Sequence, residues 1–391
     1  MTARTIEKFS ASEIAVAIAL GSAPLLILGV QPIILGELVS SGHVDLDGVG
    51  LIAMAEIIAI GLGVGIAGSV FSLDRFRVIA VLAGVVVIGA NLMSSQSAGF
   101  ADLAVARVFA GLATGALLWI TSSVIVRVRN PERTAGVFLA VQTLAQAVVA
   151  AILALLIVPG GSWSWSFVAL AVCVAVPSLF VAYLPAKMQP LTEENSSQPP
   201  ITIGVVLASL IVVFQMAVVG SLWTFIEPIS VAVGLESQRV QLVISFTLIM
   251  QAIGGGVAAI VAPKLEPRNV LMIGGIIQCL IAFYFRNYLS DDMAPFVIAC
   301  AIFGFMWLFL MPFQVRLAFW IESTGRLALF VPSLQLLGSA LGPLAASMLV
   351  TADDASPAAL ATAGFAALSV ALLLVMKVMG AQAVVGESQG S

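Results

Sequence analysis

The chain has 391 residues and a formal net charge of −4 at pH 7; 61% of its residues are hydrophobic and 9% are charged. Soluble proteins carry about 25% charged residues, so this composition and a mean hydropathy of +1.15 predict a polytopic membrane protein. No basic patch supports nucleic-acid binding. Cys173, Cys279 and Cys300 are isolated in apolar runs, which indicates neither disulfides nor a metal site. We expect no cofactor.

Twelve apolar segments are long enough to cross a hydrocarbon core of about 30 Å as helices. They cover residues 12–39, 46–72, 78–94, 101–126, 135–158, 164–184, 202–233, 239–262, 270–288, 294–319, 327–350 and 356–379. The first segment is too long for a signal peptide, and we expect it to be retained. Residues 185–200 are polar and proline-rich, which is typical of a linker. The prediction is an all-α membrane protein with two six-helix bundles, residues 1–184 and 201–391.

Lysine and arginine are distributed unevenly between the two sides of this predicted topology. Thirteen lie on the side of the termini and the linker, two (Arg239 and Arg286) lie on the opposite side, and Arg107 lies within a span. Cytoplasmic loops carry the excess of positive charge, so we expect both termini and the linker to be cytoplasmic. The predicted location is the cytoplasmic (inner) membrane of a bacterium.

An internal repeat supports the division into two bundles. Residues 46–77 and 237–268 align at a constant offset of 191 positions. Under this offset Val49, Leu51, Gly63, Gly65, Ala67 and Arg77 align with Val240, Leu242, Gly254, Gly256, Ala258 and Arg268. A second match relates Arg133 to Arg326 at an offset of 193. We expect two bundles related by a pseudo-two-fold axis, with their glycines used for close helix packing rather than for phosphate binding.

Three short motifs carry a resemblance to a known family. They are Asp74-Arg75-Phe76-Arg77 after the second span, Arg107 followed by Gly111 and Gly115 in the fourth, and the loop 129–133. With the repeat, they resemble the major facilitator superfamily of secondary transporters, over nearly the whole chain and without identifying a subfamily. The Gly-Pro of drug–proton antiporters is absent from residues 145–159. The resemblance implies alternating access around a substrate site near the bilayer midplane, in a chain that functions as a monomer.

Glu56 and Arg107 are ionisable residues inside apolar spans, where charges are costly and face protein or a water-filled cavity. Glu56 is either a protonatable carrier or a buried neutral glutamate bonded to a neighbouring helix. Arg107 keeps its charge and needs a partner, for which Glu56 is suited by its depth. In the family the matching arginine is tied to proton transfer; the alternative is an arginine that locks helix ends through carbonyl contacts.

Two further glutamates occupy nearly equivalent positions in the first and seventh spans. Glu227 precedes Pro228, which frees a backbone carbonyl and permits a bend, and it is the second candidate for proton or substrate binding. Glu37 lies closer to water. The predicted proton-coupling residues are therefore Glu56, Arg107, Glu227 and Glu37.

Charged residues at the cytoplasmic helix ends are candidates for a gate that opens and closes between states. The predicted gate residues are Asp74, Arg75, Arg77, Arg133 and Arg326. The alternative is that these charges only set the topology.

Amides and aromatic rings inside the spans predict a cavity for a small, partly apolar organic solute, because intramembrane polar side chains face other helices or a cavity. The predicted cavity residues are Gln31, Trp119, Gln142, Gln146, Trp223, Phe225, Trp307 and Gln335.

The function that we predict is proton-coupled secondary transport of such a solute, with export favoured over import. Its partners are the solute, protons and membrane lipids. Import of an organic, aromatic acid would use Arg107 as anion partner. A non-transporting sensor with a transporter's fold is a third possibility. An enzyme is disfavoured, because the chain has no HExxH motif, no Cys-His pair and a single histidine.

Overall fold

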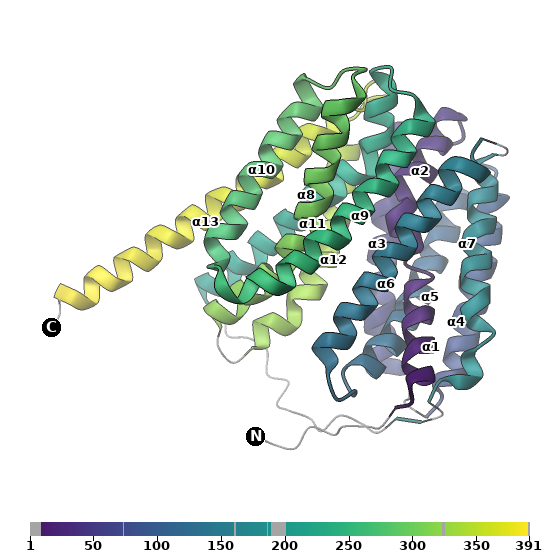
Figure 1. Ribbon diagram of the computed structural model, residues 1–391, viewed down its shortest axis with the longest axis horizontal. Coiled ribbons are helices and arrows are strands. Elements are labelled where there is room, and N and C mark those ends of the chain that lie inside the picture. Colours follow the sequence, from purple (N-terminus) through teal and green to yellow (C-terminus); the bar gives the residue numbers. More distant parts are fainter. Residues whose placement is uncertain are drawn as a thin grey trace. The chain divides into compact units, whose positions relative to one another are not determined.

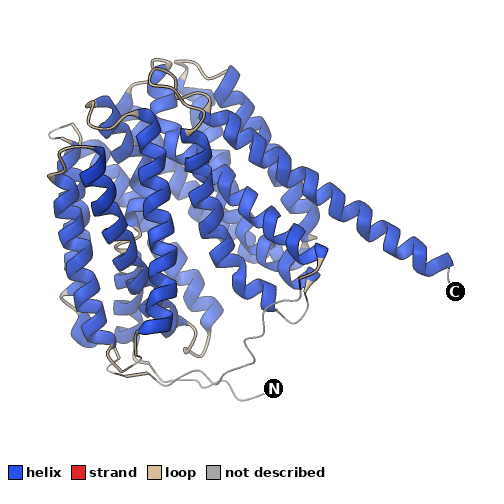
Figure 2. Cartoon of the chain, turned by 180° about the vertical axis from the view of Figure 1, so that it is seen from behind, coloured by secondary structure: helices blue, strands red, loops and turns tan. Residues whose placement is uncertain are grey.

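The computed structural model describes residues 9–72, 74–159, 162–185, 187–188, 201–322 and 325–389, without the side chains of residues 132 and 380–389. Its helices are α1 (Ala11–Ser22), α2 (Leu26–Ser40), α3 (Leu46–Val70), α4 (Phe76–Ser95), α5 (Phe100–Ile125), α6 (Pro131–Ile152), α7 (Trp163–Ser178), α8 (Ile203–Ala232), α9 (Ser237–Val261), α10 (Pro267–Asn287), α11 (Met293–Ile321), α12 (Arg326–Ser347) and α13 (Ala358–Gln389) (Figure 1). Short turns are the π-helix η1 (Leu153–Ile157) and the 3₁₀ helices η2 (Val181–Tyr183) and η3 (Ala262–Lys264). Figure 2 shows helices and loops throughout the described ranges, whose one β contact is a bridge between Thr351 and Asp354.

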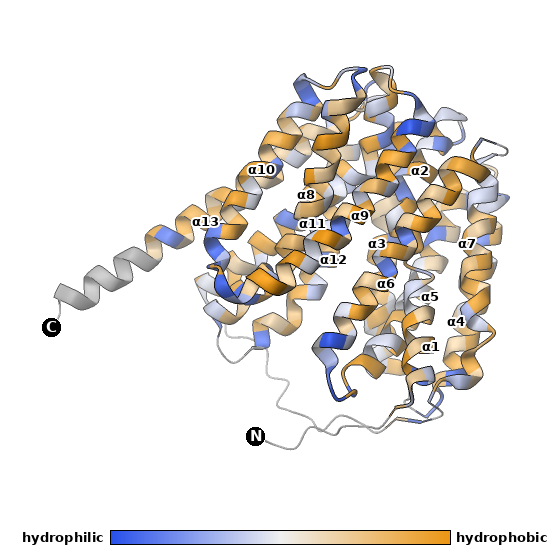
Figure 3. Cartoon of the chain, in the orientation of Figure 1, coloured by the Kyte–Doolittle hydropathy of each residue, from blue (hydrophilic) through white to orange (hydrophobic). Residues whose placement is uncertain are grey.

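Eleven spans within the described residues are long and apolar enough to cross a membrane, with α1 and α2 together forming the first, Ala11–Ser40. Figure 3 shows that apolar residues dominate these helices and that hydrophilic residues gather at several helix ends. The composition-based prediction of an all-helical integral membrane protein is confirmed.

Two predicted spans differ from the observed helices. Residues 12–39 are interrupted between Ser22 and Leu26, because Pro24 has no N–H to continue the hydrogen-bond ladder. In place of the predicted span 164–184, α7 ends one residue after Pro177 and has 16 residues. At 1.5 Å per residue α7 rises about 24 Å, less than the hydrocarbon core of about 30 Å. The prediction of twelve full-length spans is therefore confirmed only in part.

The chain divides into two compact units. The first comprises Met1–Ser196 with Glu236–Ile249, and the second comprises Ser197–Leu235 with Met250–Ser391. Helix α9 thus contributes its beginning to the first unit, where Ser245 Oγ donates to the Ala147 carbonyl of α6 at 2.7 Å. Most of the predicted linker 185–200 lies outside the described residues, as do Arg4 and Lys8 of the charge count.

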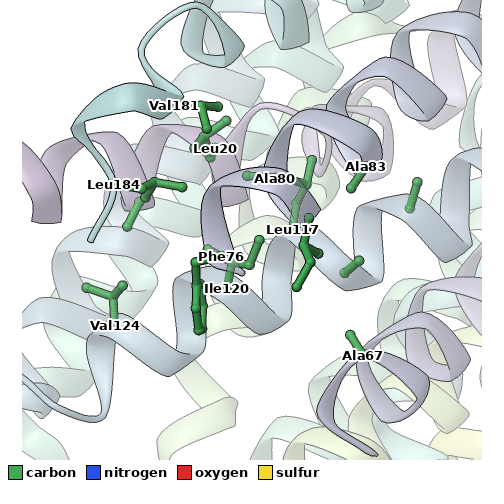
Figure 4. Packing of buried hydrophobic residues seen from close by; sticks show 14 of the residues in the cluster. Leu20, Ala67, Phe76, Ala80, Ala83, Leu117, Ile120, Val124, Val181 and Leu184 are labelled. Atoms are coloured by element: carbon green, nitrogen blue, oxygen red, sulfur yellow. The ribbon is translucent and has the colours of Figure 1, made fainter. Parts of the chain in front are cut away.

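In the first unit, α3 and α5 touch backbone to backbone. A Cβ added to Gly63 would collide with the Leu112 carbonyl, so only glycine permits this approach. At the end of the unit nearest residue 74, α4, α5 and η2 share an apolar core (Figure 4). Phe76 and Leu117 are fully buried in this core, and Trp119 stacks on Phe76 with 5.0 Å between ring centroids.

The second unit repeats the glycine contact of the first. A Cβ on Gly254 of α9 would collide with the Phe305 carbonyl of α11, at the sequence offsets of 191 and 193 from Gly63 and Leu112. The two halves therefore share a helix contact as well as a sequence pattern. Not every aligned glycine serves this purpose, since Gly65 and Gly256 face open space.

Candidate functional site

Glu56 of α3 and Arg107 of α5 form an ion pair inside the first unit. Arg107 Nη1 lies 3.1 Å from Glu56 Oε1, and the two side chains are 2% (Arg107) and 3% (Glu56) exposed. The pairing expected from their similar depth is therefore present. Neither side chain points outward to lipid.

Arg107 has additional partners on two other helices. Its Nη2 donates to Asn91 Oδ1 at 2.9 Å and its Nε donates to Ser94 Oγ at 3.1 Å, both on α4. Its guanidinium carbon also lies 5.0 Å from the ring centroid of Phe167 on α7, within the range of a cation–π contact. All three nitrogens are thus hydrogen-bonded to side chains, and removal of one partner leaves the arginine held by the others.

A second glycine, Gly111 of α5, brings the backbones of α3 and α5 close together next to the ion pair. A Cβ on Gly111 would lie 2.6 Å from the Glu56 carbonyl oxygen and 2.7 Å from Ala59 Cβ. Gly111 follows Arg107 by four residues, so both lie on the face of α5 that contacts α3. The Arg-x-x-x-Gly spacing therefore brings the backbones together one turn away from the guanidinium group.

A small cavity adjoins the pair. Its volume is about 10 Å³, close to the space that one water molecule needs. Glu56, Asn91 and Arg107 line it, and so do Ala23 and Pro24 at the break between α1 and α2. The ion pair therefore has room for a water molecule beside an interruption of the first span.

The other two predicted proton-coupling residues lie elsewhere. Glu227 is 2% exposed in α8 and belongs to the second unit, with Pro228 inside the same helix. Glu37 is half-buried near the end of α2, where its Oε1 accepts a hydrogen bond of 2.9 Å from Gln241 Nε2 of α9. The pairing of Glu37 with an amide distinguishes it from the ion-paired Glu56.

Two of the predicted cavity aromatics lie together in the second unit. Trp223 of α8 packs edge to face against Trp307 of α11, with 5.3 Å between ring centroids, and it stacks on Phe303 at 6.4 Å. Phe225 is fully buried in α8. Trp119 belongs to the apolar core of the first unit, where it packs on Phe76.

Amides form a relay across four helices of the second unit. Gln335 Nε2 donates to Gln314 Oε1 at 2.8 Å, Gln314 Nε2 donates to Gln215 Oε1 at 3.1 Å, and Gln215 Nε2 donates to the Leu271 carbonyl at 3.2 Å. All three glutamines are at most 9% exposed. Because each amide polarises the next, the carbonyl of Gln335 ends the relay as a strengthened acceptor.

The predicted cavity glutamines of the first half have different surroundings. Gln146 Nε2 donates to the Leu25 carbonyl at 2.8 Å. This gives a hydrogen-bond partner to a backbone carbonyl next to the break between α1 and α2. Gln31 is buried in α2, while Gln142 is half-buried in α6.

The predicted gate residues Asp74, Arg75, Arg77 and Arg133 are exposed. Arg77 Nε donates to the Leu184 carbonyl at 2.8 Å, which ties the start of α4 to the turn after α7. Within the described residues, Asp74 forms no ion pair with Arg75, Arg77 or Arg133. At Arg326 the backbone N–H donates to Glu322 Oε2 at 2.7 Å and begins α12.

Sequence reasoning missed Asn91, Ser94 and Phe167, which complete the surroundings of Arg107. A signal was available for the first two: Asn91 and Ser94 are polar, lie three residues apart in an apolar span, and so share one helix face. Gln314 was missed in the same way in α11. Nothing in the sequence marks Phe167 among the other aromatic residues.

No protein-family model matches the chain, and no curated protein sequence is similar to it. Several solved structures share its fold. The nucleoside transporter NupG is 13% identical, with a TM-score of 0.68 over 94% of this chain and 98% of its own. A bacterial homologue of the human lysosomal transporter Spinster, inward-facing and unoccupied, is 13% identical, with 0.64 over 95% and 96%. A D-xylose–proton symporter is 12% identical, with 0.69 over 93% and 97%. These proteins have the major facilitator fold, and so does this chain.

Proposed function

We propose that this chain, which has the major facilitator fold, is a proton-coupled secondary transporter that exports a small, partly apolar organic solute by alternating access. In this proposal α7 with its following turn serves as the sixth of twelve spans. Residues 1–184 and 201–391 form the two bundles.

The observation that carries the proposal is the buried pair Glu56–Arg107. Insertion scales put a charged side chain at the centre of a span at about 2.5–3.5 kcal/mol, so a function explains its retention better than packing does. Protonation of Glu56 would break the ion pair while Asn91 and Ser94 still hold Arg107. A carboxyl group that can gain and lose its proton without releasing its arginine is suited to a transport cycle.

The second unit offers groups suited to the solute. Trp223 and Trp307 supply apolar surface, and Gln335 supplies a hydrogen-bond acceptor at the end of the amide relay. This mixture favours a partly apolar molecule with a hydroxyl or N–H group.

Import of an organic acid has less support. It requires Arg107 as the anion partner, yet each nitrogen of its guanidinium group already donates to a protein side chain. The D-xylose–proton symporter among the similar structures supports proton coupling on this fold, without indicating the solute.

Uptake into proteoliposomes with and without a pH gradient tests the proposal. We expect the gradient to drive transport by the wild type and not by Glu56→Gln. Glu236→Gln is the matched control, because Glu236 is an exposed carboxylate paired with exposed Arg239, and it should transport normally. Wild-type coupling in Glu56→Gln would contradict the proposal, and absence of flux for a broad solute panel would favour a sensor.

A further inference from the structure

His43, the only histidine of the chain, has a fixed backbone position at the end of α2. The His43 N–H donates to the Leu38 carbonyl and the Gly42 N–H donates to the Val39 carbonyl, both at 2.9 Å. With Gly42 at a φ of +69°, this is the Schellman ending of a helix. The backbone that carries the imidazole is therefore held in place by hydrogen bonds.

Hydrogen bonds to two different groups of Ser94 link His43 to the ion pair. His43 Nε2 lies 3.1 Å from Ser97 Oγ, and Ser97 Oγ donates to the Ser94 carbonyl at 3.0 Å. The next step is covalent, because Arg107 Nε donates to the side-chain Oγ of Ser94 and not to its carbonyl, and this Oγ itself donates to the Ala90 carbonyl. A hydroxyl group has one proton to donate. When Ser97 donates it to the Ser94 carbonyl, His43 Nε2 is the donor to Ser97 and Nδ1 can receive a proton.

Aromatic rings make a second connection between the same residues. The His43 ring lies 4.2 Å from the Trp163 ring, centroid to centroid, and Trp163 packs edge to face on Phe167 at 6.3 Å. Phe167 is the ring that contacts Arg107. Contacts through Ser94 of α4 and through Phe167 of α7 thus both lead from His43 to residues that touch the guanidinium group.

We propose that His43 is a positioning residue for Arg107 and a sensor of pH on the side of the membrane that the charge distribution assigns to the outside. Proton binding at Nδ1 strengthens the bond to Ser97, because charge-assisted hydrogen bonds are shorter and stronger. It also places a cation against the Trp163 ring. Both effects tighten the segments that hold Arg107 beside Glu56. The inference rests on the proposed function.

Helices α2, α3 and α5 carry charged groups of both signs. The acidic groups are Glu37 on α2, Asp45, Asp47 and Glu56 on or before α3, and Asp102 on α5, and the cation is Arg107 of α5. The facing ends of α4 and α7, residues 94–97 and 163–167, carry no ionisable side chain. An imidazole is the side chain whose charge ordinarily changes between about pH 5 and 8.

The single histidine permits a direct test that needs no transport. In full-length, detergent-solubilised protein labelled with ¹⁵N-histidine, the imidazole signals report His43 alone. We expect Glu56→Gln to move the midpoint of their pH titration by at least about 0.3 units, a twofold change in proton affinity, because coupling between two sites is reciprocal. An unchanged midpoint overturns the proposal.

Ser97→Ala separates the hydrogen-bonded route from through-space attraction, because it removes the hydroxyl group and changes no charge. The shift caused by Glu56→Gln should fall to half or less in this background. It should persist with Ser95→Ala, whose hydroxyl donates to the Leu92 carbonyl away from the route. An undiminished shift in Ser97→Ala overturns the route. If Glu56→Gln does not fold, Ser94→Ala replaces it, and we expect this variant also to move the midpoint of the histidine titration.

A transport measurement then distinguishes the sensor from the carrier. His43→Gln keeps an N–H donor for Ser97 and does not titrate, so we expect it to transport without the wild-type dependence on outside pH. A wild-type pH profile in His43→Gln contradicts the sensor. Unimpaired coupling in Glu56→Gln contradicts the proposed function instead, whatever the histidine titration shows.

Discussion

Glu56 and Arg107 have counterparts in the second repeat at Thr247 and Cys300, at the offsets of 191 and 193 that relate Gly63 to Gly254 and Leu112 to Phe305. Both counterparts are fully buried, as is each member of the ion pair. The partners of Arg107 on α4 are replaced likewise, Asn91 by Ala282 and Ser94 by Phe285. The repeat thus preserves the glycine contact in both halves and the charged pair in the first alone.

This difference indicates what the charges are for. A position that is buried in both repeats and uncharged in one of them does not need a charge to fold. Replacing a buried ion pair by well-packed neutral residues is often neutral or stabilising. The glycine contact is therefore part of the architecture of the fold, and we propose that the ion pair serves transport rather than folding.

Placing the second repeat's residues at positions 56 and 107 is the strongest test of whether the ion pair is needed for stability or for transport. Arg107→Cys alone leaves Glu56 buried without its partner and should destabilise the protein by about 3–5 kcal/mol. The double variant Glu56→Thr/Arg107→Cys should recover most of that loss without recovering pH-driven transport. Thermal unfolding in detergent measures the first effect and proteoliposome flux the second. A double variant as unstable as the single one would show that the pair is structural.

Substitution of the contact glycine by alanine should lower the stability of the protein by a similar amount in the two repeats. In Gly63→Ala and Gly254→Ala the new Cβ would press on a backbone carbonyl, and overpacking of this kind costs about 1–3 kcal/mol. Gly65→Ala and Gly256→Ala are the matched controls, because nothing lies within 4 Å of their added Cβ. They should be neutral or gain stability by about 0.5–1 kcal/mol through helix propensity. Unequal losses at Gly63 and Gly254 would weaken the structural equivalence of the repeats.

The amide relay of the second unit is polar but uncharged, so it can be compared with the charged ion pair of the first unit in its dependence on pH. Gln314→Met should leave the Gln215 carbonyl and the Gln335 amide group without partners, at a cost of about 1–3 kcal/mol. This loss should be the same at pH 5 and pH 8, whereas the effect of Glu56→Gln on transport should depend on pH. Unfolding curves at the two pH values provide the measurement. A pH-dependent loss in Gln314→Met would contradict the assignment of proton coupling to the first unit.

The smallest expected effect concerns the loop before α13. The hydrogen bond from Ser356, with a smaller contribution from Arg286, holds the pKa of Asp354 below its usual value. A carboxyl group with a lowered folded-state pKa contributes stability above its unfolded pKa of about 3.9, and that stability is lost as pH falls through the folded value. Asp354→Asn should therefore cost less than about 1 kcal/mol at pH 7, because the group is exposed, and nothing at the lowest pH. Stability curves of both proteins from pH 7 to pH 3 test this.

Sequence reasoning reached the fold and the ion pair because both follow from burial. An isolated carboxylate and an isolated guanidinium group at similar depth in apolar spans have few options besides each other. The break at Pro24 and the early end of α7 were not predicted, since hydropathy continues across both while the hydrogen-bond ladder does not. Asn91 and Ser94 were missed because neutral polar residues are common in membrane helices. Their hydrogen bonds to Arg107 become visible only in the structure, where α4 packs beside Arg107.

The central claim is that Glu56 carries the proton, and solute-evoked proton movement tests it most directly. Wild-type protein and Glu56→Gln are reconstituted with a pH-sensitive dye inside the vesicles, and a transported solute is added. We expect proton flux with the wild type, and none with Glu56→Gln even though solute exchange at equal pH continues. Proton flux of wild-type size in Glu56→Gln would contradict the account.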